Sequence, residues 1–147
     1  MLTFDQLIVP AKKTITLRGV EREIRFVTAA DHACIEAAFP WPDPPLGPDK
    51  TKGSLAPPVP NYEDEGYMAG CKLIEFKRLA AHAAIGLRYQ TKAGLGWDSV
   101  KPEERTTYLT AAVEELSNSL AGYELQNIRR ELISFTLSDL TADALGN

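Results

Sequence analysis

The chain has 147 residues, 44% of them hydrophobic, with a formal net charge of -4 and a sequence pI near 5.2. This length and apolar content suit one ordinary domain with a real core and exclude disorder of the whole chain. The acidic balance argues against nucleic acid as a partner, because affinity for phosphate comes from clustered Lys and Arg. Two cysteines make no disulfide framework, and no apolar run approaches the roughly 20 residues that cross a bilayer. We therefore expect a soluble protein of a reducing cytoplasm, with no membrane partner.

The first predicted element is a β-hairpin. Residues 14–17 alternate polar and apolar side chains and are rich in β-branched residues. After residues 18–19 the alternation resumes, with Ile24 and Phe26 on one face. This pattern is typical of two strands with one solvated side. Because a two-stranded hairpin is marginal alone, it needs cover from another element.

A short helix follows and can supply that cover. Thr28 is a suitable N-terminal cap, and Asp31 falls in the first turn, where the helix dipole favours an acidic side chain. Ile35 and Phe39 are the predicted packing residues of this helix. The amino-terminal module is therefore predicted to consist of two strands followed by a short helix.

The next segment is rich in proline, because residues 40–60 carry eight of the ten prolines. We predict an extended, polyproline-like connector on the surface that serves geometry or binding. It separates a module over residues 1–39 from a helical region over 61–137, which a polar tail over 138–147 follows. The predicted fold class is α+β, mainly α, with a three-helix carboxyl-terminal bundle, and the whole forms one compact domain.

A long helix is predicted from about Tyr62 to Thr91, with Asn61 as its cap and acidic residues in its first turn. Two nearly opposite apolar stripes run along it: Tyr67, Cys71, Ile74, Ala81 and Ile85 on one, Leu73, Phe76, Ala80, Ala84 and Leu87 on the other. A helix of this kind needs neighbours on both faces. The chain's own elements are the simpler neighbours, and a partner protein is the alternative.

Two further helices are predicted after a break at Gly94, Gly96 and Trp97. Pro102 and the acidic residues after it favour the start of the first of these helices. Its core face is predicted to carry Leu109, Ala112, Val113, Leu116 and Leu120. Gly122 marks a turn or kink, and Leu125, Ile128, Leu132 and Phe135 continue the spacing in a final helix.

Residue patterns that carry catalysis or metal binding are missing from the sequence. His32 and Cys34 point apart on a helix, and Cys71 and His82 are three turns apart, so neither pair chelates a zinc ion as a unit. Cys71 is read as a small core residue and His82 as a helix-surface or half-buried one. There is no nucleophile motif and no phosphate-binding glycine loop. We therefore expect no enzyme, no cofactor and no metal site.

The order of these elements resembles a known protein family. A hairpin of the type Thr-Ile-Thr-Leu-Arg-Gly-Val, the capped segment over 27–31 and the proline-rich bridge to a helix near residue 61 are similar to small tail assembly chaperones of long-tailed bacteriophages. The segment over 120–128 resembles helix junctions common in such proteins. The resemblance covers most of the chain in arrangement.

The resemblance implies a non-enzymatic protein of the host cytoplasm. Such a chaperone binds the tape measure protein, a long helical rod, and keeps it soluble until tail tube subunits polymerise around it. Exposed apolar stripes on a helix suit that mode of recognition. The candidate partner-binding residues are Tyr67, Leu73, Ile74, Phe76, Ile85 and Leu87. The alternative is a structural subunit of the virion, in the connector or tail, whose proline-rich arm lies over a neighbouring subunit; self-association of the chain is a further alternative.

Overall fold

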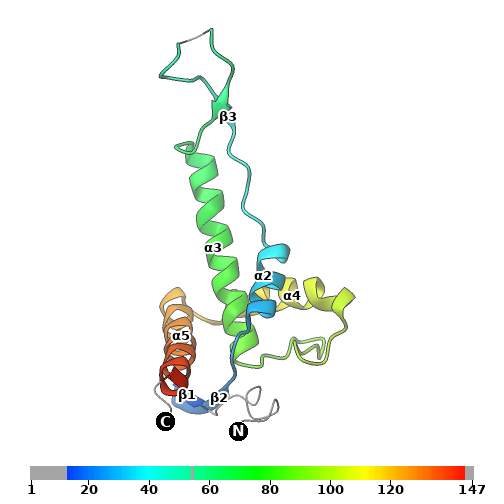
Figure 1. Ribbon diagram of the computed structural model, residues 1–147. Helices are drawn as coiled ribbons and strands as arrows, with labels where there is room; N and C mark the ends of the chain where they lie inside the picture. Colours follow the sequence, from blue (N-terminus) through cyan, green and yellow to red (C-terminus); the bar gives the residue numbers. More distant parts are fainter. Residues whose placement is uncertain (1–12, 54, 145–147) are drawn as a thin grey trace.

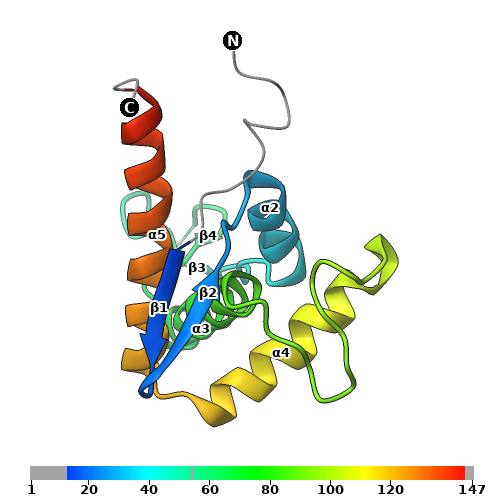
Figure 2. The same ribbon diagram turned by 90° about the horizontal axis from the view of Figure 1, so that it is seen from below.

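The computed structural model describes residues 13–53 and 55–144, with residues 135–144 described by their backbone. The predicted fold class is confirmed: the protein is α+β and mainly helical, with an amino-terminal hairpin. Helix α3 (Glu65–Gly86) is its central element. The hairpin and the helices α2, α4 and α5 surround the carboxyl-terminal half of α3, while its amino-terminal half projects from this body (Figure 1). Seen from below, α3 lies end-on among the other elements (Figure 2).

The predicted hairpin is present. Strand β1 (Lys13–Leu17) pairs antiparallel with β2 (Val20–Ile24), and Leu17 lies opposite Val20. The two residues between the strands, Arg18 and Gly19, have φ of 50° and 80°, which is the type I′ geometry that matches strand twist. Ile15 and Ile24 are buried in the core. The apolar face of the hairpin is therefore covered by the helices.

Arg18 also ties the hairpin to helix α5 (Gly122–Ala144). Its guanidinium donates to both carboxylate oxygens of Glu124, at 2.8 and 2.7 Å, and to the carbonyl oxygen of Ser119 at 2.9 Å. The hydrogen bonds from Arg18 and from the Ala121 amide lower the pKa of Glu124 to about 2. The turn of the hairpin is thus attached to the junction before α5.

Helix α2 (Ala29–Ala38) begins with the predicted cap. The Asp31 amide donates to Thr28 Oγ1 at 3.1 Å, and the Thr28 amide donates to Asp31 Oδ2 at 2.9 Å. This reciprocal pair is a capping box, which satisfies two of the free amides of the first turn. Ile35 and Phe39 are buried, as predicted.

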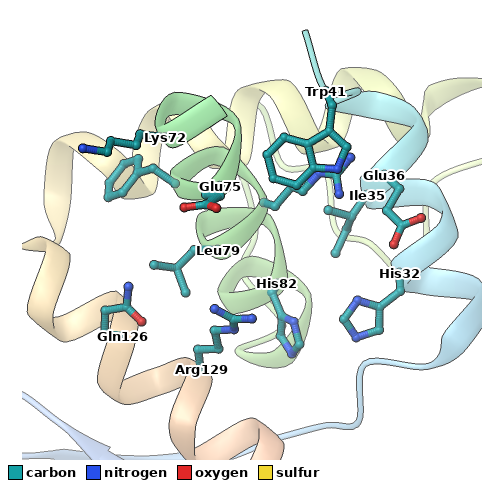
Figure 3. Close-up of a pocket in the computed structure, with 12 residues that line it drawn as sticks. His32, Ile35, Glu36, Trp41, Lys72, Glu75, Leu79, His82, Gln126 and Arg129 are labelled. Atoms are coloured by element: carbon teal, nitrogen blue, oxygen red, sulfur yellow. The ribbon is translucent and has the colours of Figure 1, made fainter. Parts of the chain in front are cut away.

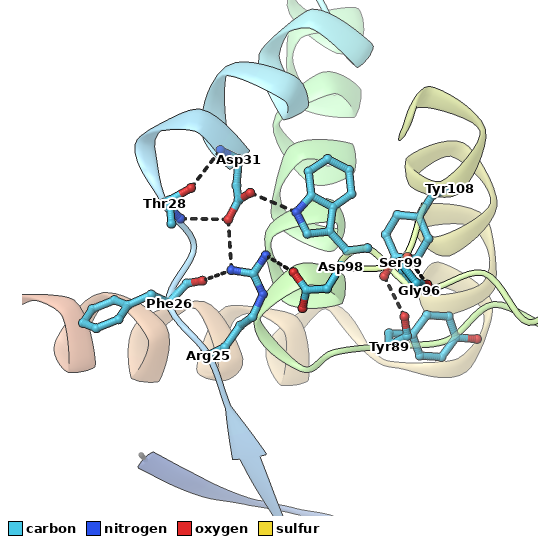
Figure 4. Close-up of polar contacts among 10 residues, drawn as sticks. Arg25, Phe26, Thr28, Asp31, Tyr89, Gly96, Asp98, Ser99 and Tyr108 are labelled. Atoms are coloured by element: carbon cyan, nitrogen blue, oxygen red, sulfur yellow. Dashed lines mark hydrogen bonds and ion pairs between the residues drawn. The ribbon is translucent and has the colours of Figure 1, made fainter. Parts of the chain in front are cut away.

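The Asp31 carboxylate also joins segments that are distant in sequence (Figure 4). Its Oδ1 accepts from Trp97 Nε1 at 2.9 Å, and its Oδ2 accepts from Arg25 Nη1 at 3.1 Å. Arg25 in turn donates to Asp98 Oδ1 at 2.9 Å. Burial alone would raise the pKa of Asp31, but the hydrogen bonds from Thr28 and Trp97 and the Arg25 charge hold it below its usual value. Asp31 is therefore ionised, and both of its carboxylate oxygens accept hydrogen bonds from within the fold.

The predicted bounds of the long helix were wrong at its start. Helix α3 begins at Glu65 rather than near Tyr62, because Asp64 is the cap and its carboxylate accepts from the Tyr67 amide at 2.8 Å. Asn61 instead accepts from the Glu63 amide at 3.1 Å in a local turn. Both side chains can act as caps, and the one nearer the helix does so.

The predicted end near Thr91 was also wrong, because α3 stops at Gly86. Arg88 has φ 55°, and the amides of Arg88 and Tyr89 donate to the carbonyls of Ile85 and Ala84 at 3.1 and 2.9 Å. These two bonds form a Schellman motif, which usually has glycine at the left-handed position. An arginine there gives no sequence signal for a helix end.

The buried half of α3 is lined with small side chains. Ala80, Ala81, Ala83 and Ala84 have no exposed surface, and a Cβ atom at Gly86 would lie 2.5 Å from both methyl carbons of Leu132. Small side chains let neighbouring helices approach closely. Helices α2, α4 and α5 all pack against α3.

Helix α4 (Arg105–Ser119) follows the short 3-10 helix η1 (Pro102–Glu104), as the proline predicted. The buried residues of α4 and α5 include most of the predicted ones: Leu109, Ala112, Val113, Leu116, Leu125, Ile128 and Leu132. Leu120 is half-buried, and the Phe135 side chain lies outside the described residues. The polar tail predicted from residue 138 was wrong, because α5 continues to Ala144. No glycine or proline interrupts residues 138–144.

The proline-rich connector runs outward from α2 beside the projecting half of α3 (Figure 1). It contains the short antiparallel pair β3 (Leu46–Gly47) and β4 (Val59–Pro60). The Asn61 amide donates to the Pro45 carbonyl oxygen at 2.7 Å beside this pair. We call the projecting half of α3 together with the connector beside it the arm. The pairing of β3 with β4 closes a loop at the outer end of the arm.

Replacing Gly86 with alanine tests the close contact between α3 and α5. The added methyl group meets the side chain of Leu132, which is 2% exposed. We expect the free energy of unfolding to fall by about 1–2 kcal/mol, measured by urea denaturation, because overpacking outweighs the better helix propensity of alanine. The control is Gly122→Ala, since nothing lies within 4 Å of a Cβ atom at Gly122. Equal stability of the two variants would contradict the contact.

Replacing Asp31 with alanine tests the buried network. The change removes the acceptor of Trp97 and leaves the Arg25 guanidinium, whose side chain is 13% exposed, without its buried counter-charge. We expect a loss of about 3 kcal/mol in the free energy of unfolding. Asp98→Ala is the matched control, because Asp98 binds the same arginine from an exposed position and should cost under about 1 kcal/mol. Similar losses in both variants would contradict the role given to Asp31.

Candidate functional site

The projecting half of α3, residues 65–78, has one face covered by the connector. A Cβ atom at Gly70 would lie 3.5 Å from Pro42 Cγ, and Tyr67 and Ile74 on this face are half-buried. At the base of the arm, Arg78 donates to the Phe39 carbonyl oxygen at 2.9 Å and lies over the Trp41 ring. The connector is thus fastened to its own helix along this side.

The opposite side of the projecting half has no cover among the described residues. Leu73 is 53% exposed and Met68 is 48% exposed, while Ala69 between them is also exposed. Phe76 lies at the base of the same side and is half-buried against the core. We call these four residues the free face of α3. Three of the four side chains are exposed, and the exposed Lys72 lies among them on the helix surface. An apolar face on a regular helix is the kind of surface that helical partners use.

The structure separates the six predicted partner-binding residues into three groups. Leu73 and Phe76 lie on the free face, whereas Tyr67 and Ile74 lie on the side that the connector covers. Ile85 has no exposed surface and belongs to the core, and Leu87 is half-buried at the end of α3. A partner therefore has access to the Leu73 side of the arm, and Ile85 serves the fold.

A hollow of about 590 Å³ lies at the base of the arm, between α2, α3 and α5 (Figure 3). Its apolar wall includes Ile35, Trp41, Phe76 and Leu79. Its polar lining consists of His32, Glu36, Lys72, Glu75, Arg78, His82, Gln126 and Arg129. The hollow is next to the free face, because Phe76 belongs to both.

Two histidines meet in this hollow, which the sequence did not indicate. The ring centroids of His32 on α2 and His82 on α3 are 4.8 Å apart, at an interplanar angle of 72°. His82 is 9% exposed, more deeply buried than predicted. Burial, His32 and the Arg129 charge lower the pKa of His82 to about 4. His82 is therefore neutral at pH 7.

The structure does not assemble the four metal-ligand candidates. Cys34 and Cys71 are free thiols on α2 and α3, both half-buried. Among the described residues, no group of three or more His, Cys, Asp and Glu side chains could hold a metal ion. The pair of histidines therefore has no third ligand in the described part of the chain.

Comparison with known proteins finds no match: no family model fits the chain, and no curated protein and no solved structure is significantly similar to it. Within residues 13–53 and 55–144, none of the helices is long and apolar enough to span a bilayer. The free face and the adjoining hollow are therefore the features from which we infer function.

The buried His82 predicts a defined pH dependence of stability. Its pKa is about 4 in the folded protein and about 6.5 in an unfolded chain, so the unfolded state binds the proton first as pH falls. Stability is full above pH 6.5 and falls by about 3 kcal/mol as pH decreases toward 4. Asp31 and Glu124, whose pKa values are lowered, reduce stability only below about pH 4. The His82→Gln variant should lose the slope between pH 6.5 and 4 in urea unfolding; an unchanged slope would contradict it.

Proposed function

We propose that this protein is a non-enzymatic assembly chaperone of a long-tailed bacteriophage, which binds the tape measure protein through the free face of α3. The observation that carries the proposal is the projecting half of α3, which holds Met68, Ala69 and Leu73 outside the body on a regular helix. A monomer gains nothing in stability from leaving such side chains in water. The phage assignment rests on the resemblance in element order.

The length and rigidity of the arm suit an extended helical client. Residues 65–78 span roughly 20 Å, which corresponds to four turns of a helix packed alongside. The connector fastened along the Gly70 side limits bending of this arm. A client helix would bury the exposed half of Leu73 and of Met68, which is worth about 1 kcal/mol for each side chain. Covering the apolar strips of a tape measure protein in this way would keep it soluble before the tail tube forms.

Replacing Leu73 with aspartate tests this function. We expect the variant to fold normally, because Leu73 is exposed, and to bind the tape measure protein at least about tenfold more weakly. The measurement is co-purification and a dissociation constant for the two proteins made together. Ile133→Asp is the matched control, since Ile133 is a similarly exposed aliphatic residue on α5, and it should bind as the unchanged protein does.

Two outcomes would overturn the chaperone function, and a third would overturn its binding surface. Absence of any affinity for the tape measure protein would exclude the chaperone function. Recovery of the protein in finished particles, bound to connector or tube subunits, would favour the structural subunit of the virion instead. An equal loss of affinity in the Leu73 and Ile133 variants would keep the client but exclude the free face as its binding surface.

A further inference from the structure

One end of the hollow concentrates basic groups from three helices. His32 comes from α2, His82 from α3 and Arg129 from α5, and their side chains converge in Figure 3. His82 is nine-tenths buried, and its ring makes no hydrogen bond to a described residue. No ion pair among the described residues involves Arg129. A deeply placed imidazole and a solvent-exposed guanidinium without an ion-pair partner among the described residues therefore line the same space.

The acidic groups near this end do not neutralise it. Both oxygens of Asp31 are already bonded to Trp97, Arg25 and the Thr28 amide. Glu36, one turn after His32 on α2, and Glu75 also line the hollow, and neither forms an ion pair with Arg129. The positive charge at this end is thus available to a bound anion.

We propose that the hollow binds a carboxylate attached to an apolar group, with the carboxylate at His82 and Arg129 and the apolar group against Leu79 and Phe76. The volume of about 590 Å³ is within the range of small-molecule sites. The planar fork of an arginine matches the two oxygens of a carboxylate. Gln126, one turn before Arg129 on α5, adds an amide donor at the same wall.

The other lining residues favour an anion with an apolar body over a bare ion. Two acidic groups, Glu36 and Glu75, and two basic groups, Lys72 and Arg78, line the same hollow, so the preference comes from its apolar wall. The side chains of Ile35, Phe76 and Leu79 on this wall carry no polar group that could bind a bare ion. An anion with an aryl or alkyl body uses both parts of the hollow.

Binding of the anion is linked to pH through His82. The charged groups that face or adjoin His82 are His32 and Asp31 from α2 and Arg129 from α5, and the hollow adds Glu36, Lys72, Glu75 and Arg78. A carboxylate beside the ring favours its protonated form and raises the His82 pKa in the complex. Affinity for an anion that stays ionised therefore increases as pH falls from 7 toward 5.

The test is an NMR titration of the full chain, which follows the ring signals of His32 and His82. The probes are phenylacetate, acetate and inorganic phosphate, each at pH 7 and pH 5. We expect saturable shifts at both rings, tightest with phenylacetate and tighter at pH 5. Arg129→Gln should weaken phenylacetate at least about tenfold. The matched control is Arg130→Gln, because Arg130 is the next residue of α5 and does not line this hollow.

Clear outcomes would overturn the inference. These are the absence of saturable shifts with every probe, equal affinity of the Arg129 and Arg130 variants, and phosphate binding as tightly as phenylacetate. The His32→Gln variant is a second test of ligand binding. Because His32 is exposed, this substitution should weaken binding without unfolding the protein.

A second experiment distinguishes a small molecule from a protein as the source of the carboxylate. Its probes are two alanine-rich helical peptides with one Glu or one Gln between leucines. Preference for the Glu peptide assigns the carboxylate to a protein partner, whereas binding of phenylacetate alone assigns it to a small molecule. Equal binding of the two peptides with none of phenylacetate would overturn the site. Because the Leu73 variants leave this hollow intact, failure here is distinguishable from failure of the chaperone function.

Discussion

The buried carboxylate of Asp31 is the contact on which the arrangement of the body depends. It accepts from the capping amide of Thr28, from the Arg25 guanidinium after β2 and from the Trp97 indole in the loop after α3. The Arg25 amide also donates to the Gly86 carbonyl at the end of α3. A two-stranded hairpin is marginal alone, and these bonds hold it against the helices. The same contacts fix α2 beside α3, and with it one wall of the hollow.

The two halves of helix α3 have different roles, one in the core and one in the projecting arm, because the size of the side chains changes along the helix. Half of the residues in the part inside the body, 79–86, are alanine, and this part ends in Gly86, so three helices approach it closely. The projecting half carries larger apolar and charged side chains, and the connector covers only the Gly70 side. One continuous helix therefore sets the direction of the free face relative to the body. The hollow lies where the two halves meet.

Local sequence patterns predicted the elements well and the site poorly. The hairpin alternation, the Thr28 cap and the core faces of α4 and α5 are all local signals. The end of α3 escaped prediction because Arg88 occupies a backbone position where glycine is the usual signal. His32 and His82 are fifty positions apart, and only helix packing brings them together. Which side of α3 stays open likewise depends on a long-range contact of the connector.

The pairing of β3 with β4 makes the end of the arm a separate, closed loop. The described residues between Gly47 and Val59 lie beyond the Asn61 to Pro45 hydrogen bond and away from the body (Figure 1). Substitutions among them should therefore leave the packing of the body unchanged. The entropy of closing a loop grows slowly, so doubling its length costs only about 0.6 kcal/mol. Insertions there would alter the reach and chemistry of the tip while leaving the core unchanged. Sequence changes at this end of the molecule can therefore create a surface for a new partner while the fold of the body is kept.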